Sequence, residues 1–245
     1  MKKKNRSFPK KSALLLTAAA LLLIGSTVGS TRAALTYYSE NYSAQVEMSK
    51  IGVTLLENGE AVSHRNYEDN GEWAEEQNGK LLENLLKKDE KFTPGKQYEE
   101  KLSVQNSGSI DSFVRVILKK SWVKDGRPET TLSPDWIELK LADGGWVVDE
   151  RATTDERMIL YYPTALAPGE TTPALSETIR INEKIAEKVT KKVEGNTIRY
   201  VYDYDGYTFT LDAEVNAVQT HNAQEAIKSA WGVDVTADET SMSLQ

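Results

Sequence analysis

Alternating hydrophobic and polar positions recur along most of the chain from residue 44 onward. In the segment 44–55, Ala44, Val46 and Met48 alternate with polar residues and the run continues through Ile51, Val53 and Leu55, so it is predicted to be a β-strand. Residues 102–105, 113–122 and 177–181 are predicted strands for the same reason. The strand at 113–122 is apolar on both faces, which predicts a central place in its sheet.

Glycine-containing turns separate these strands. Pro94-Gly95 and Pro168-Gly169 suit the two central positions of type II turns, and each leads into a strand. Asn106-Ser107-Gly108 is a further turn. Asp205-Gly206 is a preferred pair for a two-residue type I′ turn, so 200–211 is predicted to be a hairpin. Centred there, the turn pairs Tyr204 with Tyr207, Tyr202 with Phe209 and Tyr200 with Leu211.

The remaining segments follow other patterns. Residues 57–79 are polar and predict a loop, and the leucines of 81–86 predict a short amphipathic helix, so 57–91 is expected to be an inserted loop and helix. A second helix is expected after Asn222 as its N-cap, with Gly232 ending it. The polar tail 233–245 is predicted to be disordered. The pattern as a whole predicts a mainly β protein, a jelly-roll-like β-sandwich over residues 50–232 with short helical insertions and a short C-terminal helix.

The first 33 residues have the composition of a secretory signal peptide. Six lysines and arginines precede an apolar run of 12 residues at 13–24, and no acid occurs before Glu40. A transmembrane anchor is the alternative, but it needs about 20 apolar residues. Small residues at Thr31 and Ala33 place the expected cleavage after Ala33, with Ala34 as the new N-terminus. The protein is therefore expected to be exported without a stable membrane anchor.

Charge and cysteine content limit the classes of partner. Residues 34–245 contain 23 lysines and arginines against 37 acids, a formal charge of −14, which disfavours nucleic acid and anionic lipid as partners. The chain contains no cysteine, so its stability depends on its core, on assembly or on a ligand. Export without disulfides favours a bacterium with a single membrane.

The sequence contains no strong catalytic motif. His64 and His221 are far apart in sequence, and neither has a metal ligand at helical spacing, so no zinc site is predicted. No GxSxG elbow or phosphate-binding glycine loop occurs. The acids Asp203 and Asp205 and the group 68–70 offer oxygen ligands to calcium, but turn and loop roles explain them better. No catalytic, metal-binding or cofactor-binding residue is assigned.

Aromatic residues have two possible roles. Trp122, Trp136 and Trp146 lie in or beside predicted strands, so we expect them in the core. Trp73 lies in a polar segment and is the candidate exposed aromatic that contacts a partner, including a sugar.

Three stretches carry a resemblance to a known family. The segment GSTVGSTRA followed by ALTYYSENY resembles the signal region that the Gram-positive signal peptidase SipW processes. PGKQYEEKLSVQNSGSIDSFVRVIL resembles the turn, strand, turn and strand of the TasA/camelysin-type exported proteins. FTLDAEVNAVQTHNAQEAIKSAWG is similar to the last strand and helix of that group. The chain between 121 and 197 shares only its general strand-and-turn character with that group.

The resemblance implies a jelly-roll subunit, or an accessory protein, of extracellular biofilm-matrix fibres on a Gram-positive cell surface. Its partners would be a SipW-like signal peptidase and other copies of itself or a related matrix subunit. In such fibres the mature N-terminal segment fills a strand position in the next subunit, which is strand addition. Residues 34–49 are the candidate donor, with candidate anchors at Leu35, Tyr37, Tyr38, Tyr42 and Val46.

Two other functions stay open. One is a monomeric surface adhesin or carbohydrate-binding module, for which Trp73 is the candidate contact. The other is a camelysin-like metallopeptidase, although the sequence lacks the histidine pattern that a metallopeptidase needs.

Overall fold

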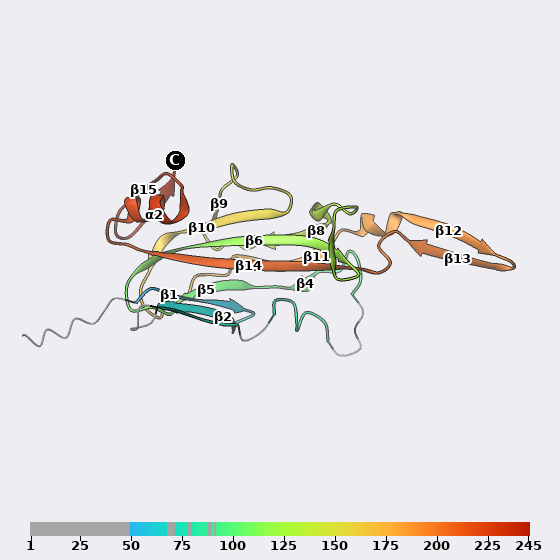
Figure 1. The fold of residues 1–245 in the computed structure, drawn as a ribbon, viewed down its shortest axis with the longest axis horizontal. Helices are drawn as coiled ribbons and strands as arrows, with labels where there is room; N and C mark the ends of the chain where they lie inside the picture. Colours follow the sequence, from blue (N-terminus) through green and yellow to red (C-terminus); the bar gives the residue numbers. More distant parts are fainter. Residues whose placement is uncertain (1–49, 68–71, 78–79, 88–89, 91) are drawn as a thin grey trace, which may run out of the picture. The chain divides into compact units, whose positions relative to one another are not determined.

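The computed structural model describes residues 50–67, 72–77, 80–87, 90 and 92–245, and within these residues the protein is a β-sandwich (Figure 1). One layer is a sheet of strands in the order β14-β6-β10-β9, with β7 paired to the end of β6. The opposite layer contains the sheet β3-β2-β1-β5 and the sheet β4-β11-β8. The mainly β class and the sandwich predicted from the sequence are therefore confirmed.

The first layer contains three long strands and two short ones. They are β6 (Ser112–Lys124), β7 (Arg127–Glu129), β9 (Val147–Val148), β10 (Arg157–Leu166) and β14 (Tyr207–Gln219). The elements of the opposite layer are β1 (Gly52–Glu57), β2 (Glu60–Tyr67), β3 (Trp73–Gln77), β4 (Tyr98–Glu99), β5 (Leu102–Asn106), β8 (Ile137–Leu141) and β11 (Ser176–Ile181). The remaining elements are the hairpin β12 (Val189–Glu194) and β13 (Thr197–Tyr202), the helix α2 (Ala223–Trp231), the terminal hairpin β15 (Val235–Ala237) and β16 (Met242–Leu244), and two 3-10 turns at Pro134–Trp136 and Glu183–Glu187.

The two sheets of the opposite layer are joined through the segment 170–175. Its amides reach the β5 carbonyls, with Thr172 N 2.8 Å from Val104 O and Leu175 N 2.8 Å from Leu102 O. Side-chain hydroxyls extend this join, because Thr172 Oγ1 accepts from Val104 N and Ser176 Oγ accepts from Leu102 N. Hydroxyls therefore satisfy buried amides where the regular ladder stops.

The main core lies between the layers. Apolar residues of β6, β10 and β14, such as Val116, Leu160 and Leu211, meet residues of β5 and β11 such as Leu102 and Ile179. Trp122 is buried in this core, and Trp136 and Trp146 pack against it. The expectation of core tryptophans is confirmed.

A second, smaller core covers the outer face of the first layer. Phe113 and Tyr161 lie on that face, and Ile227 of α2 packs on them together with Val235 and Met242. This explains why β6 is apolar on both faces and central in its sheet, as predicted. The predicted disorder of 233–245 is wrong, because two buried side chains hold β15 and β16 on the sandwich.

The leucine-rich segment after residue 80 is not a helix. Residues 81–84 form turns, and Leu82 has a positive φ of 67°, which breaks helical geometry. Leu81, Leu82, Leu85 and Leu86 still pack on the main core, so the predicted apolar face exists without the helix. The predicted loop at 57–79 is also wrong where it is described, because it contains β2 and β3.

The hairpin predicted around Asp205-Gly206 is wrong in its pairing. The turn itself is present, with Gly206 at φ 83°, but the chain changes partner there. β14 pairs with β6, so Tyr207 lies opposite Lys124 and Phe209 opposite Trp122. β13 pairs instead with β12 through the two-residue turn Gly195-Asn196.

The other predicted turns and the helix are confirmed. Gly95 and Gly169 have φ values of 81° and 80°, as the glycine of a type II turn requires. α2 follows Asn222 and ends at Gly232, whose φ is 71°. Asn222 differs from the expected cap, since it takes a left-handed conformation and its side chain makes no capping hydrogen bond.

Candidate functional site

The candidate functional site is the outer edge of β14 and the cavities beside it. β14 is the last strand in its sheet, and no described strand pairs with its outer edge. The opposite edge of the sheet is different, because β9 and an isolated bridge from Thr164 to Ser241 cover β10. β14 is therefore the long uncovered edge of the described sandwich, and an uncovered edge is a template for another strand.

Two adjoining cavities follow the first half of this edge. The larger has a volume of about 460 Å³, and the second a volume of about 380 Å³. They share Leu82 and Phe209, so one groove runs along residues 207–213 of β14. The larger cavity is lined mainly by apolar and aromatic residues, including Leu85, Leu86, Phe92, Trp122, Ile185, Tyr204 and Tyr207.

The alternating sequence of β14 directs its aromatic side chains, Tyr207 and Phe209, into this groove. Odd-numbered residues of β14 from Tyr207 to Ala217 pack on the main core, and even-numbered residues lie on the other face of the sheet, where Thr208 and Asp212 are exposed. Phe209 makes edge contacts with Phe92 and Trp122 at centroid distances of 5.2 and 6.1 Å. The aromatic face predicted for this strand is confirmed, although its partner strand differs.

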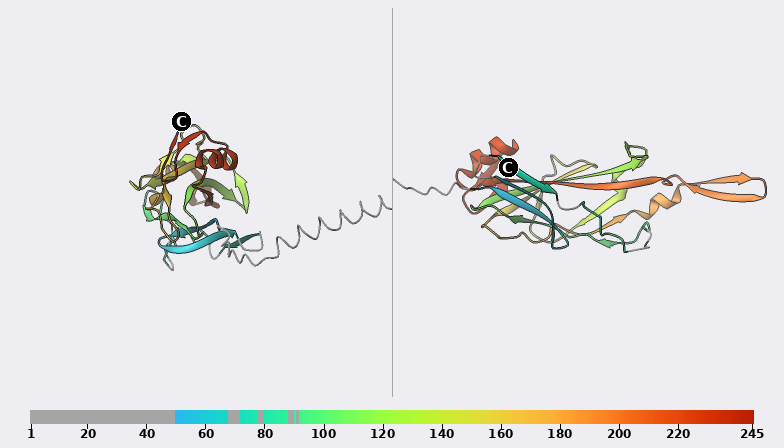
Figure 2. Two further views of the ribbon diagram at one scale, coloured as in Figure 1. Left: turned by 90° about the vertical axis from the view of Figure 1, so that its left-hand side faces the viewer. Right: turned by 60° about the horizontal axis from the view of Figure 1, so that its bottom comes forward.

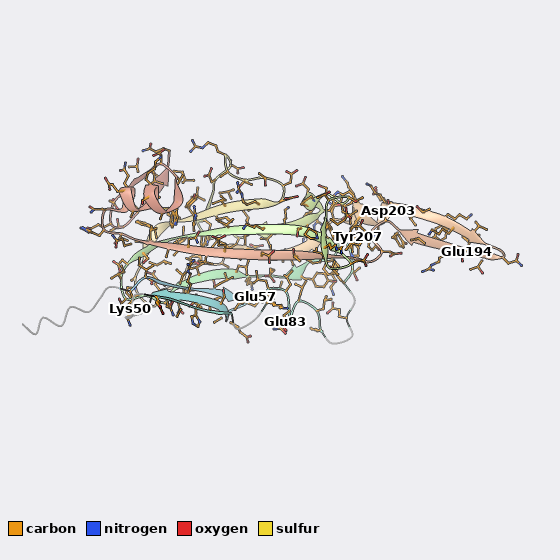
Figure 3. The ribbon with its side chains drawn as sticks, viewed as in Figure 1. Lys50, Glu57, Glu83, Glu194, Asp203 and Tyr207 are labelled. Carbon is orange, nitrogen blue, oxygen red and sulfur yellow. The ribbon has the colours of Figure 1, made fainter. Side chains whose placement is uncertain are left out.

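The far wall of the groove is the segment 80–87, which one carboxylate holds in place. Leu82 N donates to Glu57 Oε1 at 2.7 Å, which ties this segment to the end of β1. Glu57 and Glu83 lie on the same side of the molecule in Figure 3. A third, more polar cavity of about 350 Å³ is lined by Glu57, Glu60 and Glu83 with Asn58 and Lys80.

Glu100 is a buried acid next to this wall. Its side chain is 1% exposed, and its Oε1 has no hydrogen-bond partner among the described residues. Burial, followed by the nearby Glu57 carboxylate, raises the pKa of Glu100 to about 8. Glu100 therefore carries a proton at neutral pH, and nothing in the sequence pattern around it signalled this.

The histidines and the acids of the sequence analysis do not meet at one place. His64 lies on β2, with its Cα opposite that of Thr54. His221 is 77% exposed, with Nδ1 3.8 Å from Glu239 Oε1. In the described part of the chain no group of three or more histidines and acids is arranged to hold a metal ion.

The two acids considered for calcium that lie in the described residues, Asp203 and Asp205, form hydrogen bonds within their own turn and hairpin. Asp205 Oδ2 accepts from Tyr202 N at 3.2 Å and so closes its own turn. Asp203 extends the hairpin, with its N donating to Lys188 O at 3.0 Å. The acidic group 68–70 lies outside the described residues.

Several predicted residues lie outside the described part of the chain. They are the cleavage residues Ala33 and Ala34 and the candidate anchors Leu35, Tyr37, Tyr38, Tyr42 and Val46. Trp73 is described in its backbone, where it begins β3 and lies opposite Tyr67. Its expected place in a loop is therefore corrected to the start of an edge strand.

The sequence reasoning missed the β12–β13 hairpin. Its signal was present, since VTKKVE and TIRYVY alternate on either side of Gly195-Asn196, a pair that suits a two-residue hairpin turn. The hairpin extends away from the paired sheets in Figure 1 and in the right-hand view of Figure 2. It is therefore a second candidate interaction surface.

Comparisons of the chain with protein families, with characterised proteins and with solved structures give no match. Among the described residues, no helix has both the length and the apolar character needed to cross a membrane.

Proposed function

We propose that the chain is a secreted, non-catalytic structural protein that forms extracellular fibres by strand addition. Its partners are other copies of itself or a related matrix subunit, and a SipW-like signal peptidase releases it by cutting after Ala33. We further propose that the protein is located in the extracellular matrix or on the surface of a Gram-positive cell. It rests on the sequence resemblance to TasA/camelysin-type proteins and on one structural observation.

That observation is the uncovered edge of β14 beside an apolar groove. An extended segment that adds to such an edge gains main-chain hydrogen bonds, and its alternate side chains fill pockets. Residues 207–213 offer the edge, and the cavities offer apolar space for aromatic anchors. Residues 34–49 of another copy have a matching pattern, because Tyr38, Tyr42 and Val46 are separated by even numbers of residues and share one face of an extended strand.

The length of the donor is sufficient for this contact. Sixteen residues (34–49) in extended conformation span about 50 Å, which exceeds the edge at 207–213 that the groove follows. A donor that leaves one copy and enters the next makes a heterologous contact, which repeats into a filament unless it closes into a ring. This is the physical basis for a fibre.

Electron microscopy of the protein that begins at Ala34 tests the proposal. We expect filaments, and we expect Tyr37→Ser with Tyr38→Ser to abolish them because Tyr38 no longer fills the groove. Asn41→Ala, in the same segment but not an anchor, is the matched control. A synthetic peptide of residues 34–48 should block growth, whereas its scrambled version should not.

Two results would contradict the proposal. One is a protein that stays monomeric at every concentration tested. The other is filament formation that persists after deletion of residues 34–48. A protein that forms fibres before cleavage would contradict the narrower idea that cleavage after Ala33 exposes the donor.

A further inference from the structure

The hairpin β12–β13 concentrates the exposed apolar surface of the described residues. Six large hydrophobic side chains are exposed in the described part of the chain, and five of them belong to this hairpin. Val193, Tyr200 and Ile198 are the most exposed, at 64, 58 and 53%. An apolar patch of this kind on a soluble protein marks an interaction site.

The five side chains lie on one face. Cross-strand register pairs Val189 with Tyr202 and Val193 with Ile198, and places Lys191 opposite Tyr200 between them. The opposite face is polar except for Val201, since it carries Thr190, Lys192 and Thr197. The hairpin is therefore amphipathic, with an apolar face that has a single cation at its centre.

The hairpin is anchored only at its base. Lys188 Nζ lies 5.0 Å from the centroid of the Trp136 ring, and Asp203 N donates to Lys188 O. Beyond that point neither strand packs extensively on another described element, and Glu194 marks the remote end in Figure 3. Because a two-stranded hairpin is marginal in water, a partner on its apolar face would stabilise it.

Charge indicates what that partner is. Residues 188–202 contain four lysines and arginines against one acid, a formal charge of +3. The rest of the chain from residue 50 contains 19 lysines and arginines against 34 acids, a formal charge of −15. The hairpin thus complements the body of another copy of the same chain.

The same charges exclude a symmetric contact between two hairpins. Such a contact would place +3 against +3 and bring the two Lys191 ammonium groups together. A lipid surface also fits poorly, because insertion of the hairpin tip would carry Glu194 into it.

We propose that the apolar face of the β12–β13 hairpin docks on the acidic body of a second copy of this chain, as a heterologous contact. The inference rests on the proposed self-assembly, but it uses a surface that residues 34–49 do not touch in that proposal. Each copy then offers one hairpin and one receiving surface, so assembly is directional.

Paired substitutions in the full protein from Ala34 test the apolar face. Val193→Thr with Ile198→Thr keeps β-branched residues at exposed positions, so folding is retained. We expect the concentration at which copies associate, measured by sedimentation velocity, to rise about tenfold or more. Val201→Thr makes the same kind of change on the opposite face and should shift it less than about twofold.

A second pair tests the charge. Lys191→Glu and Lys192→Glu change the net charge equally, but only Lys191 lies on the apolar face. We expect Lys191→Glu to weaken association more than Lys192→Glu, and the difference to shrink in high salt. Equal effects would show that overall charge, not this face, controls assembly, and would overturn the inference.

Mixing tests the direction of the contact. A copy with Val193→Thr and Ile198→Thr still has its receiving surface, so it should accept a wild-type hairpin and end the growing chain. A small fraction of this variant should therefore shorten wild-type assemblies. Assemblies of unchanged length would overturn the heterologous contact.

The outcomes separate this inference from the proposed function. If Tyr37→Ser with Tyr38→Ser abolishes assembly while the hairpin variants assemble normally, the inference fails and strand addition stands. If only the hairpin variants fail to assemble, the hairpin contact stands and strand addition fails. If the hairpin variants lose only binding to phosphatidylglycerol vesicles, the partner is a lipid surface and the inference is overturned.

Discussion

Replacing Glu100 with glutamine should make the protein more stable at alkaline pH and flatten its dependence on pH. Glu100 is almost fully buried, and burial together with Glu57 raises its pKa to about 8, against 4.5 for an ordinary glutamate. The folded protein therefore holds a proton that the unfolded chain releases between about pH 4.5 and 8. Stability must fall as pH rises through this window and level off above it.

The magnitude follows from the size of the shift. While the folded protein keeps one proton more than the unfolded chain, the free energy of unfolding falls by about 1.4 kcal/mol per pH unit. Over the window this gives about 3–5 kcal/mol from Glu100. The glutamine introduced by Glu100→Gln has a neutral side chain of the same shape that still donates to Glu57, so the substitution removes the ionisation without leaving a cavity.

Urea denaturation followed by tryptophan fluorescence, from pH 5 to pH 9, measures the effect. We expect wild type and Glu100→Gln to agree within about 1 kcal/mol at pH 5 and to differ by about 3 kcal/mol or more at pH 9. Glu99→Gln is the matched control, because it removes an exposed carboxylate from the adjacent residue. Its curve should run parallel to that of wild type.

Parallel curves for wild type and Glu100→Gln would contradict this prediction. They would mean that Glu100 is ionised in the folded protein at neutral pH, with water or a cation in place of the proton. A calcium-dependent rise in wild-type stability at pH 9, absent in Glu100→Gln, would identify the cation.

Three further predictions concern stability alone. Asn106→Ala removes a fully buried amide that donates to the carbonyls of Ile110 and Leu166, both at 2.8 Å, and accepts from Gly108 N, so it should cost about 2–4 kcal/mol in urea denaturation. Gly108→Ala would place a Cβ 2.4 Å from the carbonyl oxygen of Lys50, a main-chain contact that must shift, and should lower the melting temperature by several degrees. Deletion of residues 233–245 exposes the second core and should cost about 3 kcal/mol or more, whereas a disordered tail would leave the melting temperature unchanged.

The strands that the sequence predicted well are those with one strong local signal and a buried partner. β5 and β11 alternate between apolar and polar residues, β6 is a long strand that is apolar on both faces, and glycine turns precede or follow them. β2 and β3 were missed for the opposite reason. They lie at one end of their sheet and, among the described side chains of β2, only Val62 is buried, so their composition is that of a loop. Polarity alone does not separate an exposed strand from an irregular segment.

The pairing error at Asp205-Gly206 has a physical cause. A local turn favours pairing of its two flanks, but β14 gains far more from β6, with which it forms a continuous antiparallel ladder of thirteen residue pairs. Long-range pairing of two long apolar strands therefore outweighs the local preference. The flank before the turn is left to pair with 189–194, and this produces the exposed hairpin.

The groove beside β14 could not be predicted because three distant segments form it. Leucines of 81–86 supply one wall, Phe92 and Ile185 close it, and the β14 edge supplies the other wall. The leucine pattern did identify the apolar side of the first segment. Its conformation depends on the positive φ of Leu82 and on the hydrogen bond to Glu57, and neither has a sequence signature.

The two proposed contacts would act at the same junction between copies. The described part of the chain begins at Lys50, and Figure 3 places this residue and the hairpin residue Glu194 at opposite ends. Tyr207, at the start of the groove, lies near the base of the hairpin in the same view. A donor that leaves one copy beyond Lys50 and reaches the groove of the next copy brings that copy's hairpin toward the body of the first.

One contact then raises the effective concentration of the other. If both exist, removing the Tyr37 and Tyr38 anchors and removing the Val193 and Ile198 face should be non-additive. Each double substitution should weaken assembly strongly, and the combination should weaken it by less than the sum of the two free-energy changes. Strict additivity would mean that the contacts form at different junctions, and a second type of contact between copies would then be required.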